Sequence, residues 1–243
     1  LTRGPALPAP PNRLIGREQD CATLLSILDR ADTRMVTLTG PGGVGKTRLA
    51  LHVASVRAPL LPGGTLFIEL ANVTDANLII DAIGRHTGLS GETQEEMERL
   101  TIAFLCEGPR LLVLDNLEQI PEAGRVVASL VASCPDLTVL ATSRMVLRIR
   151  AEQVFTVDPL ALPDRAASFT VDRIAESPAV VLLLDRARAV RHTFALTDDN
   201  SASIAEIVVR LDGLPLAIEL AAARLRTLSA SDLLARIDPP LPV

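Results

Sequence analysis

A glycine-rich run, Gly40-Pro-Gly-Gly-Val-Gly-Lys-Thr47, constrains the fold of this chain more than any other feature. The residues before it, 35–39, are rich in β-favouring side chains. Directly after it, apolar residues recur at helical spacing from Lys46 to about Val56. A strand, a glycine loop and a helix in this order open an α/β unit.

The rest of the first two thirds of the chain repeats this alternation. Further β-like runs lie at 65–70, 110–115, 137–142 and, as a candidate last strand, 153–157. Helical patterns cover about 18–31, 75–86, 93–105 and 121–133. Between Arg110 and Asp115 the run 110–115 is continuously apolar, as in strands buried on both faces of a parallel sheet. We therefore predict an α/β fold with a doubly wound parallel sheet and ligand chemistry at the carboxyl ends of its strands.

The glycine-rich run also matches the phosphate-loop pattern G-x-x-x-x-G-K-[ST] in full. Glycines let successive backbone N–H groups surround phosphates, and the start of the following helix adds its positive end. We expect Lys46 to reach the β- and γ-phosphates and the Thr47 hydroxyl to bind Mg²⁺. The loop residues expected to contact the nucleotide are Gly42, Gly43, Val44, Gly45, Lys46 and Thr47.

Lys46 is the only lysine in the chain, and the other 23 of its 24 basic residues are arginines. A position that keeps lysine in such a sequence needs a compact ammonium group that a planar guanidinium does not imitate. The composition thus supports a special role for Lys46.

Asp115 ends the β-like run 110–115, after four apolar residues, and its carboxylate is expected to hold Mg²⁺ directly or through water. Capping of the next turn is the alternative role. Asn116 follows at the position where a water-activating carboxylate usually stands, and an amide does not take a proton from water. Glu118 is the candidate substitute, and a solvated acid at a helix start is its alternative.

Arg144 follows the β-like run 137–142 in the sequence Thr142-Ser143-Arg144. A guanidinium at the carboxyl end of a neighbouring strand would contact the γ-phosphate through two parallel hydrogen bonds. An ordinary surface arginine is the alternative.

These motifs resemble those of STAND-class P-loop signalling ATPases, close to the NB-ARC or AP-ATPase group of bacterial transcriptional regulators and eukaryotic death and resistance switches. Five elements match in order: Ile15–Glu18, the phosphate loop at 40–47, LLVLDNLEQ at 111–119, Thr142-Ser143-Arg144, and Gly213-Leu-Pro-Leu-Ala217. The match covers about residues 14–238.

The resemblance implies ATP or ADP with Mg²⁺ as cofactors and slow ATP hydrolysis that controls domain orientation. It places the backbone of Ile15 and the side chain of Arg17 beside the adenine, with Arg48 as a further nucleotide contact. Pro215 and Leu216 would close over the base from the helical part. A scaffold in which the bound nucleotide is purely structural stays open. A small-molecule phosphotransferase is disfavoured, because the segment 71–100 is acidic and short of arginines.

The pattern changes near residue 163. From about 164 to 238 it is helical throughout, most clearly at 178–192, 198–211 and 216–225, and Ser177 and Thr197 are expected to start two of the helices. We expect three parts: a proline-rich lead-in at 1–13, a P-loop nucleotide-binding domain at 14–162 and a small all-α helical lid domain at 163–243. By the resemblance, winged-helix and sensor domains follow in a longer parent chain, to which the proline-rich end at 238–243 would lead. Self-assembly on activation stays open.

Composition excludes several other classes of protein. With 24 basic and 29 acidic residues the net charge is −5, and the chain has no Trp or Tyr, so we expect no direct contact with nucleic acid. No apolar run approaches the ~20 residues of a membrane span. Cys21, Cys106 and Cys134 lie far apart among apolar neighbours. We therefore expect reduced, buried thiols, no disulfide or zinc framework, and a cytoplasmic protein.

Overall fold

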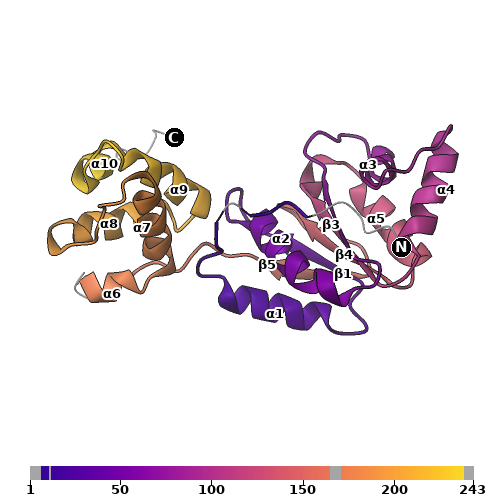
Figure 1. Cartoon of the computed structure of the whole chain (residues 1–243), viewed down its shortest axis with the longest axis horizontal. Helices are drawn as coiled ribbons and strands as arrows, with labels where there is room; N and C mark the ends of the chain where they lie inside the picture. Colours follow the sequence, from indigo (N-terminus) through magenta and orange to yellow (C-terminus); the bar gives the residue numbers. More distant parts are fainter. Residues whose placement is uncertain (1–6, 11, 165–170, 238–243) are drawn as a thin grey trace. The chain divides into compact units, whose positions relative to one another are not determined.

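The computed structural model describes residues 7–10, 12–164 and 171–237. The predictions made for 238–243, and for 1–6 and 11 in the lead-in, lie outside this part. The chain forms two compact units (Figure 1). The first contains Leu1–Gly42 and Lys46–Val157, and the second contains Asp158–Val243, with which Gly43–Gly45 are grouped.

The first unit is built on a sheet of five parallel strands in the order β2-β3-β4-β1-β5. The strands are β1 (Met35–Thr39), β2 (Thr65–Glu69), β3 (Arg110–Asp115), β4 (Leu137–Thr142) and β5 (Glu152–Thr156). All residues of β1 and β3 are buried, and for β3 the apolar run predicts this burial. The predicted α/β fold with a doubly wound parallel sheet is confirmed.

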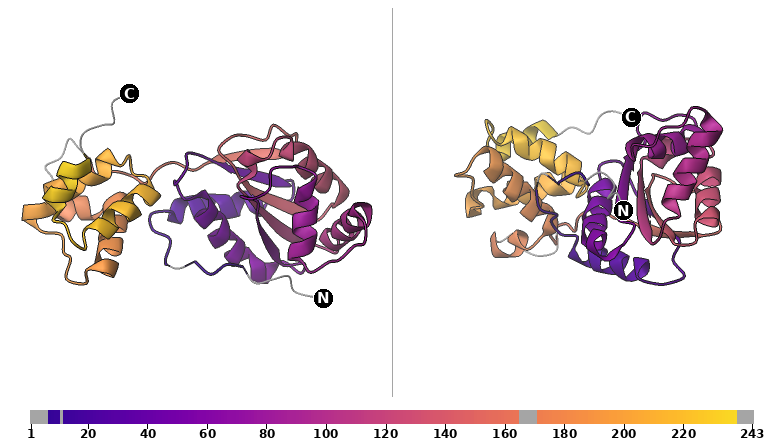
Figure 2. Two further views of the ribbon diagram at one scale, coloured as in Figure 1. Left: turned by 90° about the horizontal axis from the view of Figure 1, so that it is seen from above. Right: turned by 45° about the vertical axis from the view of Figure 1, so that its right-hand side comes forward.

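Helices cover both faces of this sheet (Figure 2). They are α1 (Glu18–Leu28), α2 (Lys46–Arg57), α3 (Leu78–His86), α4 (Gln94–Leu105) and α5 (Ala123–Ser133), with short 3₁₀ helices η1 (Ala58–Leu60) and η2 (Leu117–Gln119). Helices α1 and α2 lie on one face, and α3, α4 and α5 lie on the other (Figure 1). Between the sheet and α3–α5, residues such as Leu112, Ile79 and Val127 form one fully buried cluster. This core holds the strand ends rigidly in place.

In the part of the second unit that the structure describes, every regular element is a helix, as the sequence predicts. These helices are α6 (Val171–Ala175), α7 (Pro178–Val190), α8 (Asp198–Arg210), α9 (Pro215–Arg224) and α10 (Ala230–Ile237). Helix α7 packs on α9, and α10 packs on α8. Thr197 caps α8 as predicted, in a reciprocal capping box with Asn200. Ser177 precedes α7, but its hydroxyl donates to the Ala161 carbonyl instead of capping the helix.

Gly213, which precedes α9, occupies a position that only glycine fits. Its φ is +65°, in the left-handed region. A Cβ built on it would lie 2.3 Å from the Leu160 carbonyl oxygen. The Gly213 carbonyl in turn accepts a hydrogen bond from the Leu160 N–H at 2.9 Å. The glycine of the Gly213–Ala217 motif therefore has a structural reason within the second unit.

The prediction that all three cysteines are reduced is wrong. Cys106 and Cys134 form a disulfide with a Cα–Cα distance of 4.8 Å, and Cys21 is a free, buried thiol. Cys106 directly follows α4 and Cys134 directly follows α5, so the bridge forms where these two helices end. A sequence separation of 28 residues does not show that two helix ends converge. The argument from reduced thiols to a reducing compartment therefore loses its basis.

Among the described residues, no helix combines the length and the apolar character that crossing a membrane would need.

Candidate functional site

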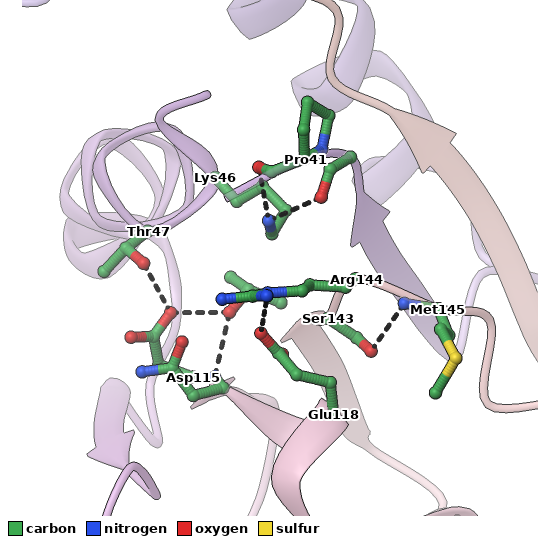
Figure 3. Close-up of polar contacts among 11 residues, drawn as sticks. Pro41, Lys46, Thr47, Asp115, Glu118, Ser143, Arg144 and Met145 are labelled. Carbon is green, nitrogen blue, oxygen red and sulfur yellow. Dashed lines mark hydrogen bonds and ion pairs between the residues drawn. The ribbon is translucent and has the colours of Figure 1, made fainter. Parts of the chain in front are cut away.

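Three adjacent strands bring the predicted site residues to one edge of the sheet. In the order β3-β4-β1, the carboxyl ends of these strands are neighbours. They lead into Asp115, the Thr142–Arg144 segment and the loop that starts at Gly40. Figure 3 shows Lys46, Thr47, Asp115, Glu118 and Arg144 gathered at this edge. The structure thus brings together the groups predicted to bind phosphates and Mg²⁺.

The phosphate loop runs from the end of β1 to the start of α2. Gly40, Gly43 and Gly45 have φ values of +145°, +76° and +99°, a backbone shape that residues with a Cβ rarely adopt. A Cβ built on Gly45 would meet no atom within 4 Å, so the loop surface there is open to a ligand. Because α2 begins at Lys46, its first-turn amides point toward this surface. The backbone fits a chain of phosphates.

Lys46 is buried, with 9% of its surface exposed. Its ammonium donates hydrogen bonds to the carbonyls of Gly40 at 2.8 Å and Pro41 at 3.0 Å (Figure 3). Burial lowers the pKa of Lys46, a change that Glu118 and Asp115 oppose and Arg144 reinforces. The only lysine of the chain is therefore a partly desolvated cation among charges of both signs.

Asp115 lies next to Thr47 in the structure. The Thr47 hydroxyl donates to Oδ1 of Asp115 at 2.7 Å, and the carboxylate is 3% exposed. A hydroxyl and a carboxylate are hard oxygen ligands of the kind Mg²⁺ prefers. At this separation both can bind one cation, so the two residues fit the metal role predicted for them.

Thr142, the last residue of β4, is a site residue that the sequence interpretation did not single out. Its buried hydroxyl donates to Oδ1 of Asp115 at 2.6 Å and accepts a hydrogen bond from the Asn116 N–H at 3.0 Å. Asn116 itself has a left-handed φ of +66°. The sequence shows that Thr142 ends a predicted strand and carries a hydroxyl. It does not show the register of β4 against β3, which brings that hydroxyl to Asp115.

Glu118 lies on η2 and faces Arg144. The Oε1 atom of Glu118 is 3.3 Å from Nε of Arg144. The glutamate side chain is 12% exposed and the arginine side chain is 66% exposed. Both candidate residues are therefore at the site, and they form an ion pair.

Arg17 and Arg48 line a separate pocket of the first unit, whereas Ile15 is not among its lining residues. This pocket of about 300 Å³ is lined by residues that include Leu14, Arg17, Cys21, Arg48 and His52. Arg17 is buried and pairs with Asp20 at 2.8 Å. The Arg48 guanidinium donates to the carbonyls of Asn12 and Arg13, so it fixes the lead-in against α2.

The pocket is formed where the lead-in, α1 and α2 meet, and α2 begins at the phosphate loop. Half-buried Ile15 follows Leu14 in the chain. Burial raises the pKa of the Cys21 thiol, so this wall of the pocket stays uncharged near neutral pH.

Pro215 and Leu216 begin α9 in the second unit, and Leu216 is 52% exposed. Their contact with a nucleotide stays a prediction.

No protein-family model matches the chain. Among curated proteins, it is 37% identical over 209 residues to a Mycobacterium tuberculosis protein whose name as an HTH-type transcriptional regulator is provisional. It is 36% identical over 225 residues to an uncharacterized protein of the same species, and 28% identical over 246 residues to the regulatory protein AfsR of Streptomyces griseus. The matches cover 86%, 92% and 95% of this chain but only 22%, 53% and 23% of those proteins.

Two solved structures share the fold. Cdc6p from Pyrobaculum aerophilum matches with a TM-score of 0.58 at 18% identity, over 93% of this chain and 64% of that one. The Aeropyrum pernix ORC1 protein, solved in complex with DNA, matches with a TM-score of 0.57 at 15% identity, over 93% and 65%. At these identities the likeness concerns the fold alone.

Proposed function

We propose that this chain is the ATP/ADP-binding switch module of a STAND-class signalling ATPase of the NB-ARC or AP-ATPase type. The observation that supports it best is the hydrogen bond of 2.7 Å between Thr47, at the end of a full phosphate-loop motif, and Asp115, at the end of β3. These two elements together suit a nucleotide with its Mg²⁺ ion. The similarity to proteins named as regulators fits a switching role.

In this proposal each polar group has one task. The loop amides and Lys46 bind the β- and γ-phosphates, Arg144 contacts the γ-phosphate, and Thr47 and Asp115 hold Mg²⁺. The metal, when bound, neutralises phosphate charge. Catalysis would then rest on positioning and charge rather than on a covalent intermediate.

The pocket of about 300 Å³ next to α2 is the proposed place of the adenine. Arg17 and Arg48, which line the pocket, and the backbone of Ile15, next to the lining residue Leu14, would contact the base, as would Pro215 and Leu216. A planar base needs a mostly apolar wall with a few polar contacts, which Leu14, Cys21 and Arg17 provide. Replacement of ATP by GTP in a binding experiment tests this assignment, since a pocket fitted to adenine should favour ATP.

Slow hydrolysis is the part of the proposal that depends on Glu118. Its carboxylate would orient the attacking water, because Asn116 cannot accept a proton. We expect wild-type protein to release phosphate from Mg·ATP slowly, and Glu118→Ala to reduce this rate by about 10²-fold or more, as for a lost general base. Glu122→Ala is the matched control, because Glu122 is an exposed glutamate in the same segment between β3 and α5, and this variant should retain the rate.

If wild-type protein binds ATP but releases no phosphate above background, the enzymatic part of the proposal fails. The alternative, a scaffold in which bound nucleotide is structural, then replaces it.

The curated relatives extend well beyond the matched segment. We propose that in such proteins the nucleotide state of this module is passed to other domains, winged-helix and sensor domains among them. Direct contact of the module with nucleic acid is not part of the proposal, because its net charge is −5. A filter-binding assay with duplex DNA at low salt tests this point, and submicromolar binding would contradict it.

A further inference from the structure

The ion pair between Arg144 and Glu118 joins two residues that the proposed function uses separately. Nε of Arg144 is 3.3 Å from Oε1 of Glu118, while Oε2 of Glu118 is buried and has no hydrogen-bond partner. A buried carboxylate oxygen without a donor is costly. One ion pair therefore holds the glutamate side chain, and a conformation that gives Oε2 a hydrogen-bond donor would lower its free energy.

The same guanidinium also faces the phosphate loop. Its Nη2 atom would lie 3.5 Å from a Cβ built on Gly42. Figure 3 shows the Arg144 side chain lying between Lys46 and Glu118. A terminal phosphate bound over the loop and the Glu118 carboxylate would therefore compete for one guanidinium.

The charges around the site make this competition consequential. The site holds two cations, Lys46 and Arg144, and two carboxylates, Asp115 and Glu118. Arg144 and both carboxylates are near enough to Lys46 to act on its pKa. Lys46 is also held by two carbonyls of the loop, whereas Arg144 is 66% exposed. Of the two cations, Arg144 has the greater freedom to change its partner.

We propose that Arg144 exchanges its ion-pair partner Glu118 for the terminal phosphate of a nucleoside triphosphate. While the ion pair is closed, the Glu118 carboxylate is engaged and does not orient water. Engagement of Arg144 by a terminal phosphate opens the pair and releases Glu118. A nucleoside diphosphate lacks that phosphate and leaves the pair closed. This inference rests on the proposed function and adds to it how the site distinguishes the two nucleotides.

Equilibrium binding tests the exchange without any measurement of hydrolysis. Affinities for ADP and for a non-hydrolysable ATP analogue are measured by calorimetry, with Mg²⁺, in wild type, Glu118→Gln, Arg144→Ala and the double variant. Loss of the competing carboxylate in Glu118→Gln should raise affinity for the analogue about 5-fold, the low end of usual coupling between sites, and leave ADP affinity within about twofold. We expect wild-type protein to bind the analogue more tightly than ADP, and Arg144→Ala should remove most of this difference.

The double variant decides between exchange and simple repulsion. If the two residues compete as proposed, Glu118→Gln gives a smaller gain in analogue affinity when Arg144 is absent. If the carboxylate only repels the phosphate, the gain is equal or larger without Arg144, and the inference is overturned.

Glu122 and Arg125 form a matched control pair, exposed and 3.5 Å apart. Glu122→Gln and Arg125→Ala should leave both affinities unchanged. Wild-type protein that binds neither nucleotide would overturn the proposed function as well. Wild-type protein that binds both, with no coupling between Glu118 and Arg144, would overturn the exchange alone.

Discussion

The hydroxyl of Thr142 donates a hydrogen bond to Oδ1 of Asp115 at 2.6 Å, which links the ends of β4 and β3. The same oxygen of Thr142 accepts from the Asn116 N–H, and Thr47 donates to the same oxygen of Asp115. The Asp115 carboxylate is thus oriented by two hydroxyl groups from different elements. Its orientation is set before any metal ion binds, as a preorganised site requires.

Thr142→Val should weaken both stability and metal binding. The substitution keeps the shape but leaves the Asn116 N–H without its acceptor and Asp115 without one donor. We expect the free energy of unfolding, measured by urea denaturation, to fall by about 1–3 kcal/mol. The Mg²⁺ concentration needed for half-maximal nucleotide binding should rise. Thr142→Ser restores the hydroxyl and should recover both quantities. Equal loss in Val and Ser variants would mean that the methyl group, not the hydroxyl, matters.

Lys46 should titrate below the ordinary value for lysine. Burial lowers its pKa from 10.5, so the unfolded chain binds more protons between the folded-state pKa and 10.5. The free energy of unfolding therefore rises with pH across that window. Because Lys46 is the only lysine, the pH dependence of its acylation rate can be followed by mass spectrometry and compared with that of a free lysine analogue. If the acylation rate of Lys46 reaches half its maximum at the same pH as the analogue, or at a higher pH, the burial argument is contradicted.

Thiol titration should separate the cysteines into two kinds. In denaturant without reductant, we expect one reactive thiol, Cys21, and after reduction three. The bridge closes a segment of 28 residues, so its reduction should lower the free energy of unfolding by about 3–4 kcal/mol. Cys21→Ser should show the same loss on reduction, whereas Cys106→Ser should show none. Three thiols before reduction would contradict the disulfide.

Gly213→Ala should destabilise the helical unit. The new Cβ would meet the Leu160 carbonyl at 2.3 Å and would hold a left-handed φ, so we expect a loss of about 2 kcal/mol or more. Gly88→Ala is the matched control, because Gly88 has a φ of +78° with no atom near its Cβ position. Gly88→Ala should lower the free energy of unfolding only by the cost of holding alanine at a left-handed φ, about 1 kcal/mol. Equal losses at both positions in thermal unfolding would remove the role of the Leu160 contact.

The parallel sheet and the alternation of strands and helices along the chain could be predicted, because strands buried in a parallel sheet are short runs rich in apolar and β-favouring residues. The order of the strands within the sheet was not predicted. The strand 110–115 was predicted with its observed bounds, and so was 137–142. The phosphate loop, Asp115 and Arg144 could be placed at one edge because parallel strands end on the same side. In all these cases the signal lies within a few adjacent residues.

Contacts between distant segments could not be predicted in this way. The bond from Thr142 to Asp115 depends on the register of β3 and β4, and the disulfide depends on where α4 and α5 end. The ion pair of Glu118 with Arg144 likewise joins η2 to the end of β4. Each residue carries a plausible role alone, and only the folded chain shows which partner it has.

Calorimetric titration of the purified chain with Mg·ATP and Mg·ADP, in wild type and Lys46→Met, tests the central claim most directly. Lys46→Met removes the ammonium at similar side-chain length. The account predicts that wild type binds adenine nucleotide and that Lys46→Met binds it at least about tenfold more weakly, the loss expected for a desolvated charge contact. Equal affinity in both proteins, or no binding to the wild type, would contradict the assignment of this loop as a nucleotide site.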